Sequence, residues 1–230
     1  PNRIIAGTDG SVWVSGSHQG SAAVAVRLHD DWNRHVFPDA SKTFSHLAAL
    51  ETSDGSFVFG CGTPPVDLMD LSGGGVVFER RGNHYHGTHL PPPVFITRPA
   101  TMAERKGDGL YMGDDFVAKG FSGEQITATD LGVFNQQWID QIIVDAKNDL
   151  WIACLGIGIY QYDGSEWTLH GPASGMNSRY VLNLLEDRER GWIIALTEDG
   201  FYYFDGNNWG KQEFPSDVSL RRENHTMFQD

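Results

Sequence analysis

Three histidines fall within six positions in the segment HYHGTH, residues 84–89. Imidazole nitrogens are common metal ligands, and alternate residues such as His84 and His86 would point to one side of a strand. No Cys, Asp or Glu lies in this segment to complete a tetrahedral ligand set, and His84 is expected in a turn. We therefore predict no metal site here.

Aromatic residues beside amides and a guanidinium occur at two matching places in the chain. Sugars offer C–H faces for stacking on aromatic rings and hydroxyls for hydrogen bonds, so this combination suits a carbohydrate ligand. The alternative is that both rings only pack where successive repeats join. The candidate ligand-binding residues are Asn135, Gln137, Trp138, Asn177, Arg179 and Tyr180.

Further candidates come from the two longest irregular segments, residues 62–75 and 86–99. Loops longer than about 12 residues are uncommon unless they have a role, although they can also be plain surface loops. If the protein is an enzyme, its carboxylates and imidazoles should converge around one pocket. Asp67 and Asp70 lie in the first segment and His89 and Arg98 in the second, and Asp114 and His18 are added as side chains that would converge with them at such a pocket.

Established catalytic motifs are missing from the chain. There is no G-x-S-x-G elbow, no H-E-x-x-H pair and no P-loop. Adjacent carboxylates such as Asp114 and Asp115 would point to opposite faces of a strand, which argues against an acid/base pair. We predict no catalytic residue and no cofactor, and consider an enzyme the weaker alternative.

The chain carries a formal net charge of −13, and most of its 17 Lys and Arg residues are scattered. A nucleic-acid surface needs clustered basic residues, so no nucleic-acid partner is predicted. The sequence has no run of 18 apolar residues and no apolar leader. We expect no direct membrane contact from this segment.

The elements that would position these candidates repeat along the chain. The motif YDGSEWT at residues 162–168 returns as FDGNNWG at residues 204–210. A second marker, a two-residue turn followed by an apolar strand as in KNDLWIA (147–153), precedes each copy. The aromatic or apolar marker of the first motif is found at Trp32, Tyr85, Ile126, Trp167 and Trp209, at intervals of 53, 41, 41 and 42 residues.

This period predicts an all-β fold, a β-propeller with about five four-stranded antiparallel blades. Asp-Gly and Asn-Asp turns between β-branched and aromatic runs are strong hairpin signals, and a four-stranded sheet must stack on neighbours to bury both faces. Residues 1–230 would form one propeller domain or part of a six- or seven-bladed ring. The expected blades are 2–37, 45–88, 101–129, 138–170 and 180–214, and residues 224–230 would begin another.

The motif YDGSEWT is interpreted as architectural because it recurs with the repeat. The last repeat also carries Gly175, Met176, Val181, Leu184, Asp187, Gly191, Asp205, Gly206 and Trp209. On these residues the last two repeats resemble the two-component regulator propeller family. The resemblance implies a likeness to extracytoplasmic sensor regions of bacterial signalling proteins, and therefore a periplasmic or secreted location.

The favoured function is a non-catalytic propeller that binds a small molecule, a glycan or another protein. The tight turns should gather on one face, and the longer links on the other, where we expect the site near the axial opening. Two alternatives remain open: a propeller lyase or glycoside hydrolase, and a protein–protein scaffold.

Overall fold

The computed structural model describes residues 3–41, 48–62, 75–81, 84–89, 101–113, 118–121 and 139–213. These residues form five antiparallel sheets, in each of which consecutive strands are neighbours. The first sheet contains β1 (Arg3–Ala6), β2 (Val12–His18), β3 (Ser21–Leu28) and β4 (Asp31–Ser41). The second contains β5 (Ala49–Glu51), β6 (Phe57–Gly62), β7 (Gly75–Arg81) and β8 (His84–His89).

The third sheet has three described strands, β9 (Thr101–Arg105), β10 (Gly109–Gly113) and β11 (Ala118–Phe121). The fourth contains β12 (Ile139–Val144), β13 (Leu150–Cys154), β14 (Gly158–Tyr162) and β15 (Trp167–His170). A short 3₁₀ turn, η1 (Pro172–Ser174), leads to the fifth, with β16 (Val181–Asp187), β17 (Trp192–Thr197), β18 (Gly200–Phe204) and β19 (Trp209–Gln212). The expected outer strand around Ile126 lies outside the described residues.

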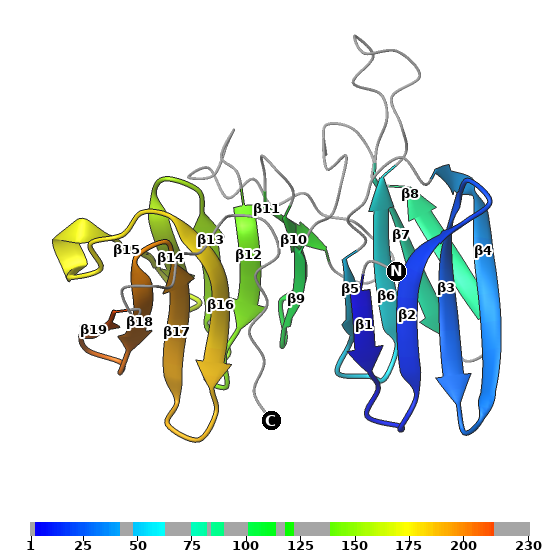
Figure 1. Ribbon diagram of the computed structural model, residues 1–230, viewed down its shortest axis with the longest axis horizontal. Coiled ribbons are helices and arrows are strands. Elements are labelled where there is room, and N and C mark those ends of the chain that lie inside the picture. Colours follow the sequence, from blue (N-terminus) through cyan, green and yellow to red (C-terminus); the bar gives the residue numbers. More distant parts are fainter. Residues whose placement is uncertain are drawn as a thin grey trace, which may run out of the picture.

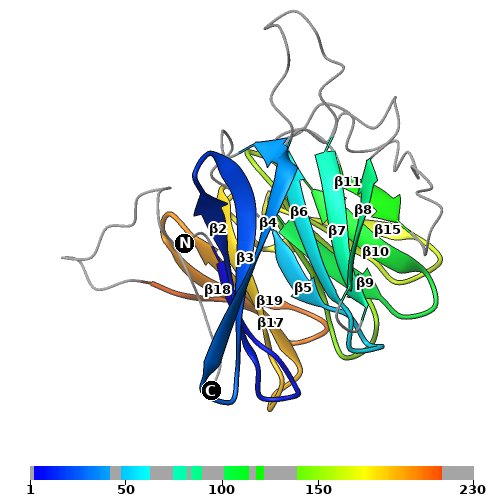
Figure 2. The ribbon, with the colours of Figure 1, turned by 90° about the vertical axis from the view of Figure 1, so that its right-hand side faces the viewer.

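The sheets follow one another around a common axis (Figure 1). Their innermost strands pack in chain order, β1 on β5, β5 on β9, β9 on β12 and β12 on β16. No comparable packing joins β16 to β1 within the described ranges. The β1–β2 and β16–β17 turns point to the same side of the molecule in both ribbon views (Figures 1 and 2). The predicted all-β propeller fold is confirmed, whereas a further blade at residues 224–230 lies outside the described part and stays a prediction.

The motif YDGSEWT forms the turn between β14 and β15. Oδ1 of Asp163 accepts the backbone N–H groups of Ser165 at 2.7 Å and Glu166 at 3.0 Å. Gly164 has φ +106°, a left-handed conformation that favours glycine. The same carboxylate contacts and glycine conformation recur at Asp205 and Gly206 between β18 and β19, whereas His29 and Asp30 form the turn between β3 and β4.

Aromatic rings fill the junctions between sheets. At the first junction Trp13 stacks on Phe57, with ring centroids 4.2 Å apart, and belongs to a buried cluster shared by the first two sheets. At the last junction Trp151 lies among residues of the fourth and fifth sheets. Each blade therefore buries its faces against its neighbours, as the four-stranded repeat requires.

A polar contact links each described sheet to the next at the end with the tight turns. Glu51 accepts the backbone N–H of Thr8 at 2.9 Å, and Glu104 accepts that of Ser53 at 2.5 Å. Glu186 accepts the N–H of Ala146 in the same way, at 2.8 Å. We call these contacts the glutamate clamps.

The junction between the third and fourth sheets has a different clamp. Val144 pairs with Leu150 as Glu51 pairs with Phe57, so it stands where the second, third and fifth sheets have glutamate. Oδ1 of Asn148 accepts the N–H of Lys106 at 2.8 Å instead, and Nδ2 of Asn148 donates to the Lys106 carbonyl at 3.0 Å. An amide therefore replaces the carboxylate at this one junction.

Candidate functional site

Four of the predicted ligand-binding residues have described side chains: His18, Asn177, Arg179 and Tyr180. His89 is the last residue of β8, and its side chain is outside the described part. The others also lie outside it and stay predictions: Asp67, Asp70, Arg98, Asp114, Asn135, Gln137 and Trp138.

Asn177, Arg179 and Tyr180 lie together in the link that joins β15 to β16. The link is anchored by Met176, which is fully buried between the fourth and fifth sheets, and by Ser174, whose hydroxyl donates to the Gly171 carbonyl at 2.9 Å. Beyond this anchor the three side chains are exposed, Tyr180 to 47%. The structure therefore presents an aromatic ring, an amide and a guanidinium on one short, tethered segment.

The position of Tyr180 is set by local contacts. Its backbone N–H donates to the Ser178 hydroxyl at 3.3 Å, and its ring lies beside Gly156 in the link between β13 and β14. Both links join strand ends opposite the tight turns. This is the face on which the sequence predicted a site.

His18 belongs to the first sheet, at the end of β2, and is separated from the Tyr180 link by the arrangement of the sheets (Figure 1). Its ring Nδ1 lies 3.2 Å from Nη1 of Arg34. Since a guanidinium only donates, Nδ1 acts as the acceptor and the proton of a neutral ring is on Nε2. The structure does not bring His18 into contact with the other three described candidates.

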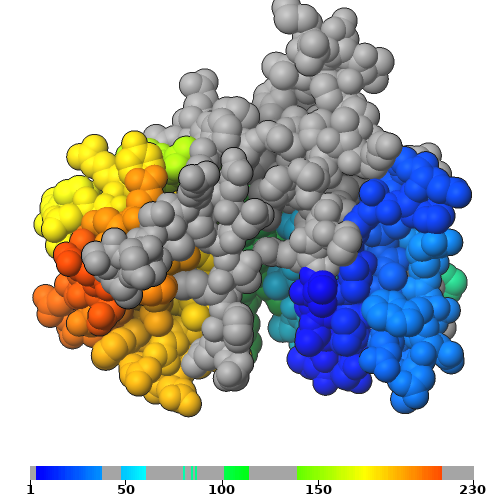
Figure 3. Space-filling view, in the orientation of Figure 1, coloured from blue at the N-terminus to red at the C-terminus, as the bar shows by residue number. Residues whose placement is uncertain are grey.

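A groove of about 690 Å³ lies near the axis on the face with the tight turns. Its walls come from β5, β9 and β12 and from the turn at residues 52–55. The space-filling view is hollowed between the first and last sheets, where atoms of the second and third sheets are visible (Figure 3). Glu51 and Glu104 line the groove, but both carboxylates are engaged in the glutamate clamps.

A smaller pocket of about 420 Å³ lies between the first and second sheets. It is lined by Asp9, Ser11, Val26, Asn33, His35 and Arg80, among others. The sequence analysis did not select these residues. The sequence gives one indication of this pocket, which is Arg80. This charged residue occupies the position in its repeat that Phe204 occupies in the last repeat.

Several ionisable groups with shifted pKa values lie at the sheet junctions. Burial lowers the pKa of His170 to about 4, and Trp209 Nε1 donates to its Nδ1 at 3.1 Å. Burial also raises the pKa of the Cys154 thiol to about 12. Neither residue lines either of the two pockets described above.

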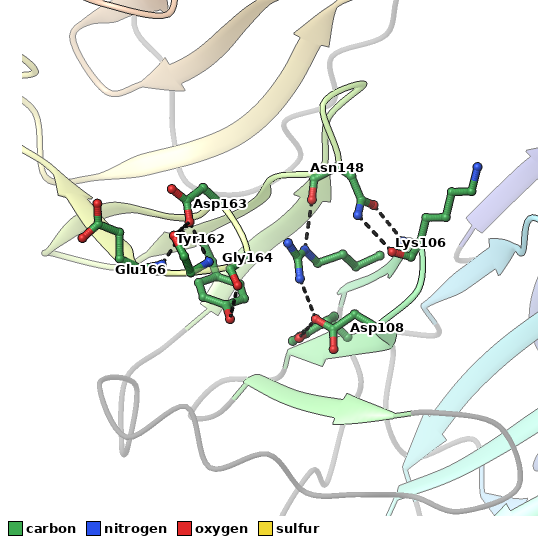
Figure 4. Close-up of polar contacts among 10 residues, drawn as sticks. Lys106, Asp108, Asn148, Tyr162, Asp163, Gly164 and Glu166 are labelled. Carbon is green, nitrogen blue, oxygen red and sulfur yellow. Dashed lines mark hydrogen bonds and ion pairs between the residues drawn. The ribbon is translucent and has the colours of Figure 1, made fainter.

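Arg105 contacts Asp108, Asn148 and Tyr162, which are labelled in Figure 4, in a polar network at the junction of the third and fourth sheets. Its Nε donates to the Asn148 carbonyl at 2.9 Å, its Nη1 contacts Asp108 at 2.8 Å, and its guanidinium lies 4.9 Å from the Tyr162 ring centroid. The Tyr111 hydroxyl donates to Asp108 at 2.6 Å, and burial followed by this bond raises the Tyr111 pKa. The contacts of Arg105 with Asn148 and Tyr162 join two blades, whereas those with Asp108 lie within the third sheet.

Two further observations concern ligands and membranes. Within the described part of the chain, no group of three or more His, Cys, Asp or Glu residues is arranged to hold a metal ion. The same part contains no helix with the length and hydrophobicity that a membrane crossing needs.

No protein-family model matches the chain, and no curated protein matches its sequence. Among solved structures, the chain is similar to PorZ, a surface component of the type-IX secretion system of Porphyromonas gingivalis, with 18% identity and a TM-score of 0.66. It is also similar to the extracellular domain of the putative one component system BT4673 from B. thetaiotaomicron, with 20% identity and a TM-score of 0.65. A third similar structure is virginiamycin B lyase from Staphylococcus aureus, with 14% identity and a TM-score of 0.67.

These alignments cover 90%, 95% and 93% of this chain, and 32%, 28% and 70% of the respective structures. The chain therefore spans about a third or less of the first two proteins. At these identities the likeness shows the propeller fold alone, because one fold serves both sensor domains and enzymes.

Proposed function

We propose that this chain is part of an extracytoplasmic bacterial propeller that binds a ligand without transforming it, and that the ligand is a glycan. Two of the similar structures support an extracytoplasmic location and a ligand-binding role, since one is a bacterial surface component and one is the extracellular domain of a putative one component system. The resemblance of the last two repeats to the two-component regulator propeller family supports the same class.

The observation that carries the proposal is the link before β16. Tyr180 is 47% exposed although large aromatic residues elsewhere in the repeat are mostly packed between sheets. A tethered ring lowers the conformational entropy lost on binding, and its face can stack on the C–H groups of a sugar. Asn177 and Arg179 are exposed beside it and supply donors and an acceptor for hydroxyl groups.

The test is a glycan array probed with the intact protein, followed by titration of any sugar that binds. We expect Tyr180→Ala to weaken binding roughly tenfold, the loss of about 1.4 kcal/mol of stacking. Trp32→Ala is the matched control, because Trp32 is an exposed aromatic residue, 55% accessible, on the outer strand β4 of another sheet.

The proposal fails if no glycan binds, or if both variants bind as the unmodified protein does. Cleavage of a bound glycan would instead favour the enzyme alternative.

A further inference from the structure

The pocket between the first and second sheets departs from the pattern of the repeat. At the corresponding junction of the fourth and fifth sheets, Phe204 and Trp209 lie against Trp151 and His170. The Phe204 ring centroid is 5.7 Å from that of Trp151 and 4.9 Å from that of His170. Trp209 also donates to His170, so aromatic residues fill this junction.

Strand register identifies the same positions at the first junction. Trp13 pairs with Ile5 as Trp151 pairs with Ile143, and each of these isoleucines is one residue before the end of its innermost strand. Arg80 pairs with Phe57, just as Phe204 pairs with Ile193. Arg80 therefore stands where the last sheet has a phenylalanine.

Two more positions of the first sheet follow the same register. His35 pairs with Val24 as His170 pairs with Ile159, so an imidazole is kept at this position. Val26, however, stands where the fourth sheet has Gln161, whose Oε1 lies 2.9 Å from Nε2 of His170. The first junction thus keeps the imidazole but lacks the glutamine that engages it in the fourth sheet.

Arg80 is held in place by an aromatic ring. Its guanidinium carbon lies 4.7 Å from the ring centroid of Trp13, which is itself fully buried and fixed by a 2.6 Å hydrogen bond from its Nε1 to Ser11. Stacking occupies the face of a guanidinium and leaves its N–H edge directed in the plane, where a carboxylate can accept two hydrogen bonds. The charged group is therefore pre-organised at the wall of a cavity.

The remaining wall residues define the kind of anion that fits. Asn33 and His35 contribute an amide and an imidazole, and Val26 and Leu28 contribute an apolar surface. Desolvation lowers the pKa of His35, so at neutral pH its ring is uncharged and can donate or accept a hydrogen bond. Hydrogen bonds from Ser11 lower the pKa of Asp9, so this wall also carries one negative charge.

We propose that this pocket binds a small hydroxylated carboxylate, whose carboxylate group pairs with Arg80 and whose hydroxyls meet Asn33, His35 and Asp9. Arg80 and Arg34 both line the pocket, so together with Asp9 its wall carries a net charge of +1, which one carboxylate balances and a dianion such as phosphate exceeds. This site is separate from the Tyr180 link and does not depend on the function proposed above.

The probes are D-glucuronate, D-glucose and inorganic phosphate, each titrated into the intact protein by calorimetry. We expect glucuronate to bind, and glucose and phosphate to bind at least about tenfold more weakly, because a charge-assisted bidentate pair contributes about 1.5–3 kcal/mol. Arg80→Phe copies the residue of the last sheet, so it should keep the fold and abolish glucuronate binding.

Arg27→Phe is the matched control. Arg27 pairs with Val12 as Arg80 pairs with Phe57, so it has the same repeat position in the first sheet, but its guanidinium pairs with Asp30 at 2.9 Å and does not line the pocket. This variant loses the same charge and should bind glucuronate normally. If Arg80→Phe does not fold, Asn33→Thr, which copies Thr168 of the fourth sheet, should weaken glucuronate binding.

Three results would overturn the proposal: glucose binding as tightly as glucuronate, phosphate binding more tightly than glucuronate, or a folded Arg80→Phe or Asn33→Thr protein with unchanged affinity for glucuronate.

Discussion

Replacing Arg105 with methionine should weaken the junction between the third and fourth sheets strongly. Methionine keeps most of the aliphatic stem but removes the guanidinium that contacts the Asn148 carbonyl, Asp108 and the Tyr162 ring. The Arg105 side chain is only 11% exposed, so water cannot readily replace these contacts.

The size of the effect follows from those contacts. A hydrogen bond from a charged donor to a carbonyl contributes about 1.5–3 kcal/mol, and a cation–π contact about 0.5–1 kcal/mol. The pair with Asp108 adds less than about 1 kcal/mol, because the Asp108 side chain is partly exposed. We therefore expect the free energy of unfolding to fall by about 3 kcal/mol.

Urea unfolding followed by tryptophan fluorescence measures this change. With a urea dependence of about 3 kcal/mol per molar, the midpoint should fall by about 1 M. The control is Arg190→Met, since Arg190 also pairs with an aspartate, Asp187 at 2.6 Å, and also lies over an aromatic ring, but is 60% exposed. That variant should unfold close to the unmodified protein, and equal midpoint shifts for both variants would refute the reasoning.

Two further perturbations test the other junctions. Burial lowers the pKa of His170 to about 4, so its neutral form contributes stability that is fully present above about pH 6.5 and is lost as the pH falls toward 4. The free energy of unfolding, measured across this pH range, should therefore depend less on pH in His170→Gln than in the unmodified protein. The same pH dependence in both proteins would contradict this. Glu104→Ala should remove the acceptor of the Ser53 N–H, lower the free energy of unfolding by about 1 kcal/mol and speed hydrogen exchange at the Ser53 amide. The control Glu213→Ala, at a side chain that is 81% exposed, should change neither quantity. Unaltered exchange at Ser53 in Glu104→Ala would show that the clamp is not formed in solution.

The sequence was sufficient to predict the blades because their signals are local. The turn at residues 147–148 and the apolar strand that follows it specify a hairpin within about ten residues, and the same signals recur with the period of the fold. The exception is the third repeat, whose marker position is Ile126 instead of an aromatic residue and lies outside the described part.

The contacts between blades could not be predicted in this way. Each glutamate clamp joins residues about 40 to 50 positions apart, and the contact becomes visible only when neighbouring sheets are assembled. The pocket beside Arg80 was missed for the same reason. A charged residue in a strand indicates a cavity only when the residues that face it from the neighbouring sheet are known. Of the predicted site, the structure describes the Tyr180 link and His18, and the remaining residues stay predictions.

The glutamate clamps have a consequence for how such an array can grow. In each clamp one donor is a backbone N–H group, which is present whatever residue occupies the turn, as Thr8, Ser53 and Ala146 illustrate. Thr8 and Ser53 each add a hydroxyl donor, at 2.7 and 3.0 Å, but Ala146 has none. The side chain that all three clamps share is therefore the acceptor, and it belongs to the blade that follows. A duplicated repeat would therefore carry its own means of attachment to its predecessor, while its turns remain free to diverge.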